Sequence, residues 1–350
     1  MTWRYLLLLI ALIVLIVRIS TYLVSQSITT QCSEQCVRYA DNGLTYIERI
    51  RDIIYKTVSE RIFKLLPSPH ADLILGLTLG FDNLSRNTKF KEYLKSTGTI
   101  HVVVVSGFNI TLVLSFISKF IESRYTIRGF IKLYFLLFLY SVVSGFNPPI
   151  VRAYIMSFFQ GWGTVTGRKI PIAEILIASG VIMLIIKPSY ISDFSFILSF
   201  LATLGLCAFS EEIINFFRKF KVDRYQIIND FSSSLAAQLL VWPVISFNFG
   251  EFSIVSLLAN MLTLWTIPVS TILGFILLVF LFVPGPVANI LAALVYPFLD
   301  IFVSLVKILG NLPFSSIQLR ISLFTLATYY IAIFIFYRIL RANRTDTKLP

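Results

Sequence analysis

The sequence predicts an all-α polytopic membrane protein with about ten transmembrane helices, several of them broken or short. Composition is the first reason: of 350 residues, 57% are hydrophobic and only 14% are charged, and the mean hydropathy is +0.82. These values exclude an ordinary soluble domain. Apolar stretches of span length recur along the chain, and Lys and Arg gather in alternate connecting segments, as the positive-inside rule expects.

A transmembrane helix needs about 20 predominantly apolar residues, and fewer where the helix is broken. We expect spans at 3–24, 99–120, 128–146, 148–163, 170–187, 190–209, 230–249, 252–283, 286–310 and 320–340. The first contains Arg4 near its start and has no cleavage site before polar sequence, so it is expected to stay uncleaved. The stretch 252–283 is long for one helix, and Pro268 either kinks it or divides it into two short spans.

Charge placement predicts the orientation of these spans. If the N-terminus is cytoplasmic and each stretch crosses once, the most cationic segments fall inside: 119–132, 168–169, 218–224 and 338–348. The opposite loops carry little positive charge: 147–149, 187–190, 250–251 and 311–319. Both termini are therefore expected to be cytoplasmic. The net charge of +12 has two explanations at this point, membrane orientation or a polyanionic ligand.

Residues 25–98 would then lie outside the cytoplasm. Apolar residues recur at helical spacing over 46–66 with charged residues on the other face, which predicts an amphipathic helix. This helix lies either on the membrane surface or on the outer face of the protein itself. Residues 68–81 are too short for a clear span and predict a half-buried or re-entrant helix. Cys32 and Cys36 are candidates for a disulfide.

Polar residues interrupt two of the apolar stretches. The first interruption carries His101, Ser106 and Asn109, with Gly107 at a point where a helix can break. The second runs from Ser144 to Ala153 and carries Asn147 and Arg152. Polar groups inside a membrane are expensive and usually face a cavity or a partner helix. Two interrupted segments of this kind suggest a translocation path.

Arg152 is the strongest single candidate for contact with a ligand. It follows Pro148 and Pro149, which favour the first turn of a helix, where free N–H groups and the positive dipole end attract anions. An arginine there can meet a phosphate group. The alternatives are that Arg152 extends toward the membrane surface or pairs with Asp193 or Glu174.

Metal and nucleotide chemistry find little support in the sequence. His70 and His101 are the only histidines, so a His-rich dinuclear metal site cannot be built. The glycine-rich run 161–169 lacks the spacing of a phosphate loop and is interpreted as a cytoplasmic turn. Ser106 and His101 would lie about 140° apart on a continuous helix, so a hydrolase would need a break between them. We expect no cofactor, no metal and no enzymatic activity.

Four segments, in order, resemble the signature elements of the ComEC/Rec2 competence family: 96–109, 144–156, 187–206 and 238–260. The resemblance implies an inner-membrane channel that passes single-stranded DNA into the cytoplasm during natural transformation. Family members often carry an OB-type domain and a metallo-β-lactamase-like domain, and this chain resembles neither. Phe108–Thr111 also departs from the family pattern, because Asn109 stands where a second histidine is common.

The resemblance completes the set of expectations. Residues 1–66 hold the first span and the amphipathic helix, 67–341 form the channel domain, and 342–350 form a basic cytoplasmic tail. The hypothesised DNA path comprises His101, Ser106, Asn109, Asn147, Arg152, Asp193, Gln238 and Asn260. For several of them, Gln238 and Asn260 above all, hydrogen bonding between helices is the competing explanation.

The implied partners are single-stranded DNA, the lipid bilayer, a cytoplasmic ATP-driven DNA translocase and single-strand-binding proteins. A separate nuclease and DNA receptor are further candidates. Two other functions stay open: a secondary transporter of a small anionic solute, which also uses broken helices and an arginine, and a less favoured intramembrane hydrolase.

Overall fold

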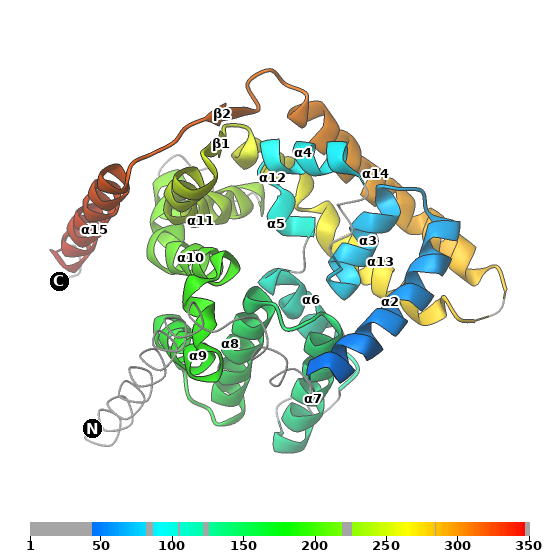
Figure 1. The fold of residues 1–350 in the computed structure, drawn as a ribbon. Coiled ribbons are helices and arrows are strands. Elements are labelled where there is room, and N and C mark those ends of the chain that lie inside the picture. Colours follow the sequence, from blue (N-terminus) through cyan, green and yellow to red (C-terminus); the bar gives the residue numbers. More distant parts are fainter. Residues whose placement is uncertain are drawn as a thin grey trace, which may run out of the picture. The chain divides into compact units, whose positions relative to one another are not determined.

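The computed structural model describes residues 44–81, 87–103, 106–121, 126–218, 226–283 and 285–346. The predicted span 3–24 and the pair Cys32 and Cys36 lie outside the described residues. Helices dominate the described chain (Figure 1), which confirms the all-α prediction apart from two short strands. Helices also occur in every predicted stretch from residue 99 onward.

The element bounds follow the predicted stretches closely. The elements are α2 (Leu44–Leu65), α3 (His70–Leu79), α4 (Thr88–Ser96), α5 (Ile100–Val103), α6 (Gly107–Ser118), α7 (Ile127–Val143), α8 (Pro148–Val165), α9 (Ile172–Ile186), the 3₁₀ helix η3 (Pro188–Ser192), α10 (Phe194–Arg218), α11 (Gln226–Phe249), β1 (Glu251–Ser253), α12 (Ser256–Thr263), α13 (Thr266–Phe280), α14 (Val287–Gly310), β2 (Ser316–Gln318) and α15 (Leu323–Asp346).

The structure confirms only part of the predicted set of membrane crossings. Within the described residues, three helical segments are long and apolar enough to cross a membrane: Ile100–Ser118, Phe194–Arg218 and Val287–Gly310. The pair α12 and α13 makes a fourth if it counts as one span. Several other apolar helices are shorter, α3 and α9 among them, so ten crossings are not confirmed.

The break within 252–283 does not lie at Pro268. Helix α12 ends at Thr263 and α13 begins at Thr266, so the interruption comes before the proline. Pro268 is the third residue of α13, where a backbone N–H has no partner within the helix in any case. The proline therefore fits the start of the second helix without kinking it.

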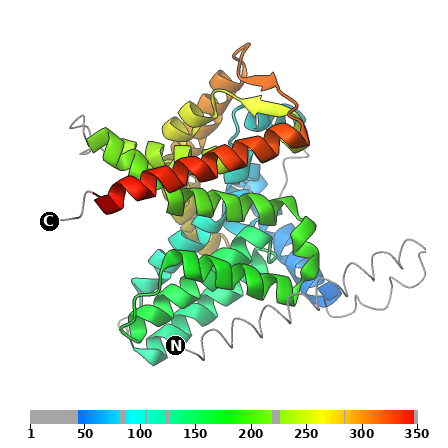
Figure 2. The same ribbon diagram turned by 90° about the vertical axis from the view of Figure 1, so that its left-hand side faces the viewer.

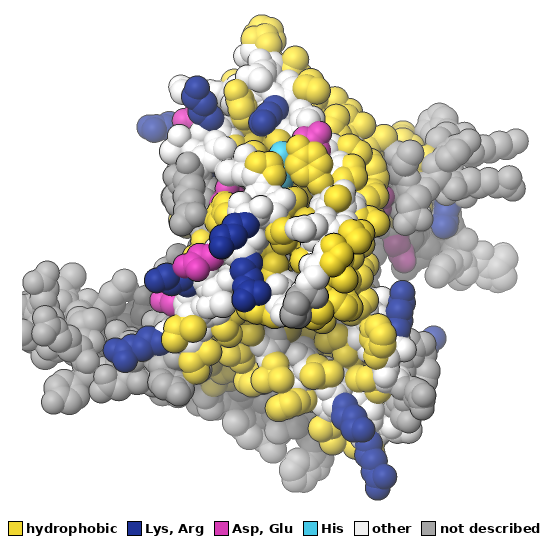
Figure 3. Space-filling model, turned by 90° about the vertical axis from the view of Figure 1, so that its right-hand side faces the viewer, with side chains coloured by type: hydrophobic (Ala, Val, Ile, Leu, Met, Phe, Trp, Pro, Cys, Tyr) yellow, Lys and Arg dark blue, Asp and Glu magenta, His cyan; other side chains and the backbone are white. Residues whose placement is uncertain are grey.

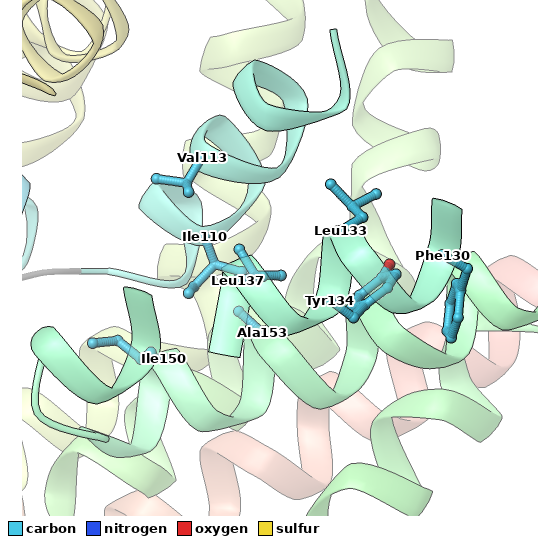
Figure 4. Packing of buried hydrophobic residues seen from close by; sticks show 8 residues of the cluster. All are labelled: Ile110, Val113, Phe130, Leu133, Tyr134, Leu137, Ile150 and Ala153. Atoms are coloured by element: carbon cyan, nitrogen blue, oxygen red, sulfur yellow. The ribbon is translucent and has the colours of Figure 1, made fainter. Parts of the chain in front are cut away.

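The chain divides into two compact units, which are described separately. The first contains Val102–Ser199, Ile267–Asp300 and the described residues before Leu84. Its core lies between α6, α7 and α8 (Figure 4). The cluster is Ile110, Val113, Phe130, Leu133, Tyr134, Leu137, Ile150 and Ala153. Across it, the Tyr134 hydroxyl donates to the Ser157 carbonyl, and Gly161 leaves room on α8 for the tyrosine ring.

Helix α2 docks on the first unit rather than lying free on a membrane. Val58, Ile62 and Leu66 are buried, whereas Ile50 and Ile53 nearer its start stay exposed. The structure thus decides the open alternative in favour of docking along the second half of the helix. On the face shown in Figure 3, Lys, Arg, Asp and Glu side chains are interspersed beside a broad hydrophobic surface.

Two arginines of α2 reach the C-terminal ends of other helices. Arg51 Nε donates to the Val143 carbonyl at the end of α7 (3.1 Å), and its guanidinium stacks on Phe81 beyond the end of α3. Arg61 Nη1 donates to the Leu281 carbonyl beyond α13 (3.1 Å). Cations at helix C-termini are stabilising because the last carbonyls carry partial negative charge.

These contacts bring the ends of α7 and α13 close together. Tyr140 and Phe275 lie near those ends, with ring centroids 5.5 Å apart. Arg51 and Arg61 are ten residues apart on one helix, which is about 15 Å, whereas the hydrocarbon core of a bilayer is about 30 Å thick. The Cα atoms of the two arginines are therefore separated by about half that thickness. The pair α12 and α13 is either one broken span or a re-entrant loop.

The second unit contains Ser85–His101, Phe200–Thr266 and the described residues from Ile301. Pro243 lies inside α11 and has no N–H, so the Leu239 carbonyl loses its helical donor. The Tyr329 hydroxyl of α15 donates to that carbonyl (2.9 Å), and Tyr330 donates to the next one, Leu240 (2.6 Å). Figure 2 shows α15, in red, beside the green helices of this unit. The carbonyls of Leu239 and Leu240 next to Pro243 thus serve as the docking point of α15.

Strands β1 and β2 form an antiparallel ribbon that pairs Glu251 with Gln318 and Ser253 with Ser316. The Ser253 hydroxyl donates to the Ser96 carbonyl at the end of α4. Three segments assigned to one side of the membrane by charge, 87–96, 250–253 and 311–319, therefore meet in this unit.

Candidate functional site

The turn between α7 and α8 belongs to the second polar interruption. Gly145 (φ 88°) and Phe146 (φ 49°) both adopt positive φ, which is uncommon for a bulky residue. The Tyr190 hydroxyl holds the Phe146 carbonyl at 3.4 Å. Gly145 packs directly against the Arg51 guanidinium, where a Cβ would collide. This strained turn fixes the direction in which α8 leaves.

Helix α8 begins as the sequence predicts. Asn147 is its N-cap residue, and Pro148 and Pro149 occupy the first two helical positions. The Asn147 backbone carbonyl accepts from Ile150 and Val151, while its side chain makes no capping hydrogen bond. Arg152 is the fifth residue of α8 and is half-buried. The guanidinium therefore lies near the positive end of the helix dipole.

Helix α6 begins beside Arg152. Ser106 is its N-cap residue in extended conformation (φ −95°, ψ 165°), which confirms that the helical path is broken before Gly107. The Ser106 side chain makes no capping bond. A Cβ on Gly107 would lie 3.1 Å from Arg152 Nη2, 3.2 Å from the Ala153 Cβ and 3.3 Å from the Pro149 carbonyl. The N-termini of α6 and α8 thus meet around one guanidinium group.

Asn109 faces away from this meeting point. It is fully buried, and its Nδ2 donates to the Leu77 carbonyl near the end of α3 (3.0 Å). Helix α3 is buried along its whole length, so its last carbonyls need such donors. The side chain has a visible structural role, and a contact with DNA stays a prediction.

Tyr190 contacts the turn between α7 and α8, and Asp193 follows Tyr190 three residues later in the chain. Asp193 Oδ1 accepts from the Ser195 N–H at the start of α10 (2.8 Å). Tyr190 stacks on Phe196 and lies below the Lys187 ammonium group. Burial and the nearby charge of Asp193 raise the pKa of Tyr190 above its ordinary value. The phenol therefore stays neutral near pH 7 and remains a donor to Phe146.

The other predicted path residues belong to the second unit. His101 is exposed, and its Nδ1 lies 2.8 Å from the Gly98 carbonyl. Gln238 and Asn260 are buried, and the side-chain oxygen of each accepts no hydrogen bond from the part of the chain that the structure describes. Buried acceptors of this kind are rare because they are costly to leave unpaired.

The surroundings of the two histidines and Ser106 decide whether these residues form a catalytic or metal-binding group. Within the described ranges, neither histidine is hydrogen-bonded to Ser106: His70 Nε2 faces Asp300 Oδ1 at 3.1 Å, and His101 faces Gly98. The described residues also contain no group of three His, Cys, Asp or Glu side chains that could hold a metal ion.

An open groove runs between α7 and α8. Aromatic residues such as Phe130, Phe135, Phe138 and Trp162 line it. None of the predicted path residues does so. Its apolar lining suits acyl chains or another helix better than a charged strand.

Sequence reasoning missed Arg51. It was placed only on the charged face of the amphipathic helix, because nothing local identifies the carbonyls that it contacts. The glycine-rich run was also interpreted too broadly: Gly161 and Gly163 lie within α8, and only the segment from Thr166 forms a turn.

A family model described as "Competence protein" matches residues 77–343, which is more than half of the chain. The chain belongs to the competence protein family. The predicted ComEC/Rec2-type resemblance is thus confirmed, and the protein is a membrane protein with a role in competence, the uptake of DNA. No curated protein and no solved structure matched the chain. In this competence protein, the two polar interruptions are the starts of α6 and α8.

Proposed function

We propose that this competence protein conducts single-stranded DNA across the bacterial cytoplasmic membrane, and that the starts of α6 and α8 contact the passing phosphates. The observation that carries the proposal is the packing of Arg152 Nη2 against Gly107, which joins two helix N-termini to one guanidinium. Each N-terminus is equivalent to about half a positive charge. Three positive groups in one place favour an anion.

The chemistry of the site suits transit rather than tight binding. A path for DNA needs groups that contact phosphate without trapping it. Arg152 offers one formal charge, and the dipole ends offer partial charges that act over a short range. The side chains of Ser106 and Asn147, which make no capping hydrogen bond, add neutral polar groups near Arg152. Gln238 and Asn260 supply buried acceptors in the other unit, which we propose as further contacts along the path.

The remaining expectations belong to the same proposal. A cytoplasmic ATP-driven translocase would pull the strand, single-strand-binding proteins would receive it, and a separate nuclease and receptor would prepare it. Both termini are proposed to be cytoplasmic. His101 and Asp193 are proposed to lie along the path, His101 through its exposed ring. The family indicates transport rather than catalysis.

The test is complementation of a gene deletion. Transformation frequency and DNA bound at the cell surface are scored separately in strains that carry the wild type, Arg152→Ala, Arg152→Lys or Arg128→Ala. Arg128 is an exposed cation on α7 and serves as the matched control. We expect deletion to abolish transformation and Arg152→Ala to lower it by ~100-fold, both with surface DNA preserved. Arg152→Lys should retain more of it, and the control should behave as wild type.

Two outcomes would point elsewhere. Normal transformation in the deletion strain would exclude a channel function and favour transport of a small anion. Normal transformation in Arg152→Ala, with the deletion strain defective, would retain the channel and remove Arg152 from its path.

A further inference from the structure

A cationic surface stands on the side of the membrane where the positive-inside rule expects few cations. The sequence places Arg86, Lys89, Lys91 and Lys95 within ten residues, opposed by Glu92. Residues 25–98 are predicted to be extracytoplasmic, so membrane orientation does not explain these charges. The alternative explanation of the positive charge, a polyanionic ligand, fits them.

The structure builds these charges into a defined surface of the second unit. Helix α4 buries Phe90 and Leu94, which leaves Lys89 and Lys95 exposed on its outer side. Its end is fixed to the ribbon, because the Ser253 hydroxyl bonds the Ser96 carbonyl and lies 3.4 Å from the Ser315 carbonyl.

Close packing holds α4 against its neighbours. A Cβ at Gly310 would lie 2.9 Å from Tyr93 Cδ1, so the end of α14 fits tightly against α4. A Cβ at Gly98 would lie 2.7 Å from the Ser256 Cβ. The lysines are therefore presented by a rigid support and not by a loose loop.

An exposed aromatic side chain and a third cation complete the surface. Phe314 directly precedes Ser315 and is 72% exposed. At the other end of the ribbon, Leu319 N–H donates to the Gly250 carbonyl (2.9 Å), and the exposed Arg320 packs its aliphatic part on Gly250. Sites for single-stranded nucleic acid combine cations for the backbone with aromatic faces on which bases stack.

We propose that Lys89, Lys95, Phe314 and Arg320, named here the α4–ribbon surface, receive the single-stranded DNA before it enters the path. This inference rests on the proposed function and adds the place where the substrate first binds. A membrane surface is the weaker candidate for these cations, because α4 has its apolar side buried in the protein and keeps no apolar face for lipid.

The experiment uses the full-length protein in nanodiscs of neutral lipid, with a fluorescent oligothymidine as probe. Affinity is measured against salt concentration for the wild type, for Lys89→Ala/Lys95→Ala/Arg320→Ala and for Phe314→Ala. A matched triple, Lys56→Ala/Lys64→Ala/Arg128→Ala, removes the same charge from exposed positions elsewhere. Each phosphate contact contributes about 0.7 to the salt slope on a single strand.

The surface triple should lower the salt slope by about 2 and weaken binding by roughly 30-fold or more at moderate salt. Phe314→Ala should weaken it roughly tenfold with the slope unchanged, because stacking does not release counterions. The matched triple should change affinity by less than about threefold. Equal losses in both triples would show a general charge effect and overturn the proposal.

Three further outcomes complete the test and keep this inference apart from the proposed function. If the surface triple loses binding to anionic-lipid vesicles while oligothymidine binding is unchanged, the surface recognises lipid and the proposal fails. If the surface variants bind and transform normally while Arg152→Ala does not transform, the channel stands without this receiving surface. If the triple loses DNA binding but the deletion strain transforms normally, the surface stands and the channel function fails.

Discussion

Arg51 and Arg152 lie in the same unit and serve opposite ends of helices. The Arg51 guanidinium meets carbonyl groups: Val143 at 3.1 Å, with Gly80 and Ser144 at 3.5 Å. Arg152 instead packs where α6 and α8 begin, among groups that carry partial positive charge. The first placement stabilises the ends of two helices, whereas the second brings a cation to the starts of two helices, where a further anion is favoured. We infer that one arginine holds the unit together and the other serves the substrate.

The largest expected effect comes from Arg152→Ala. If the guanidinium contacts phosphate during transit, losing a charge-assisted contact of about 2.7 kcal/mol lowers uptake by ~100-fold. Stability should fall less than in Arg51→Ala, because the change also removes a cation from beside two positive dipole ends. Transformation frequency and thermal unfolding in detergent measure the two effects. If Arg152→Ala is much less stable and lowers uptake only as far as it lowers the amount of folded protein, Arg152 has the same structural role as Arg51.

Arg51→Ala should have the opposite profile. It removes donors from the ends of α3 and α7 and the stacking on Phe81, which together stabilise by about 2–3 kcal/mol. We expect a lower unfolding temperature and less protein in the membrane, with uptake per folded molecule near that of the wild type. Arg51→Lys should recover part of the stability. If Arg51→Ala unfolds at the same temperature as the wild type, the structural role of Arg51 is contradicted.

Asn109 belongs with Arg51 although it lies on α6. Its amide donates to the Leu77 carbonyl from a fully buried position, so Asn109→Ala should destabilise by about 1–3 kcal/mol. Asn109→Asp should cost more, because a carboxylate would face the same carbonyl without a proton to donate. Unfolding temperatures of the two variants test this order. A reversed order would show that the amide is not the group that α3 requires.

The smallest effect concerns a carbonyl in the second unit. Tyr329→Phe removes the donor to the Leu239 carbonyl that Pro243 leaves unpaired, which should cost about 1 kcal/mol. In the double variant with Pro243→Ala, the helix regains its own N–H donor, so the tyrosine change should cost less. If Tyr329→Phe destabilises equally with and without Pro243→Ala, the contribution of the hydroxyl does not depend on the proline.

The sequence predicted the surroundings of Arg152 better than those of Arg51. Pro148 and Pro149 mark the start of α8, and Gly107 marks the start of α6, so both helix N-termini were expected where they occur. The periodicity of 46–66 likewise predicted α2. These features depend on local preferences for turns and helix starts, which a single sequence reveals.

The rest depends on contacts between distant residues. Arg51 meets a carbonyl 92 positions away, and no local pattern identifies that partner. The strands of the ribbon have three residues each, too short for a periodic signal. Helix α4 could have been predicted, because Asn87 is a suitable N-cap residue and Phe90 and Leu94 are four positions apart. Its otherwise polar composition is typical of a loop, so the helix was not predicted.

The same distinction explains why the arrangement of the spans was only partly predicted. Hydropathy measures whether 252–283 is apolar, not where it ends. The position of that end is set by Arg61 on Leu281 and by Tyr140 on Phe275, which are contacts between separate segments. The stretch is long enough to span a membrane, yet it consists of two helices that turn apart between Thr263 and Thr266.

The most direct test of the account is a photocrosslink from the start of α6 to DNA during uptake. Phe108 is 49% exposed beside Gly107, and benzoylphenylalanine at this position would report what passes Arg152. The same probe at Phe135, 59% exposed in the aromatic groove, serves as the control. We expect labelled single-stranded DNA to be captured at position 108 and not at 135. Capture at 135 alone, or no capture at 108 in cells that transform normally, would contradict the account.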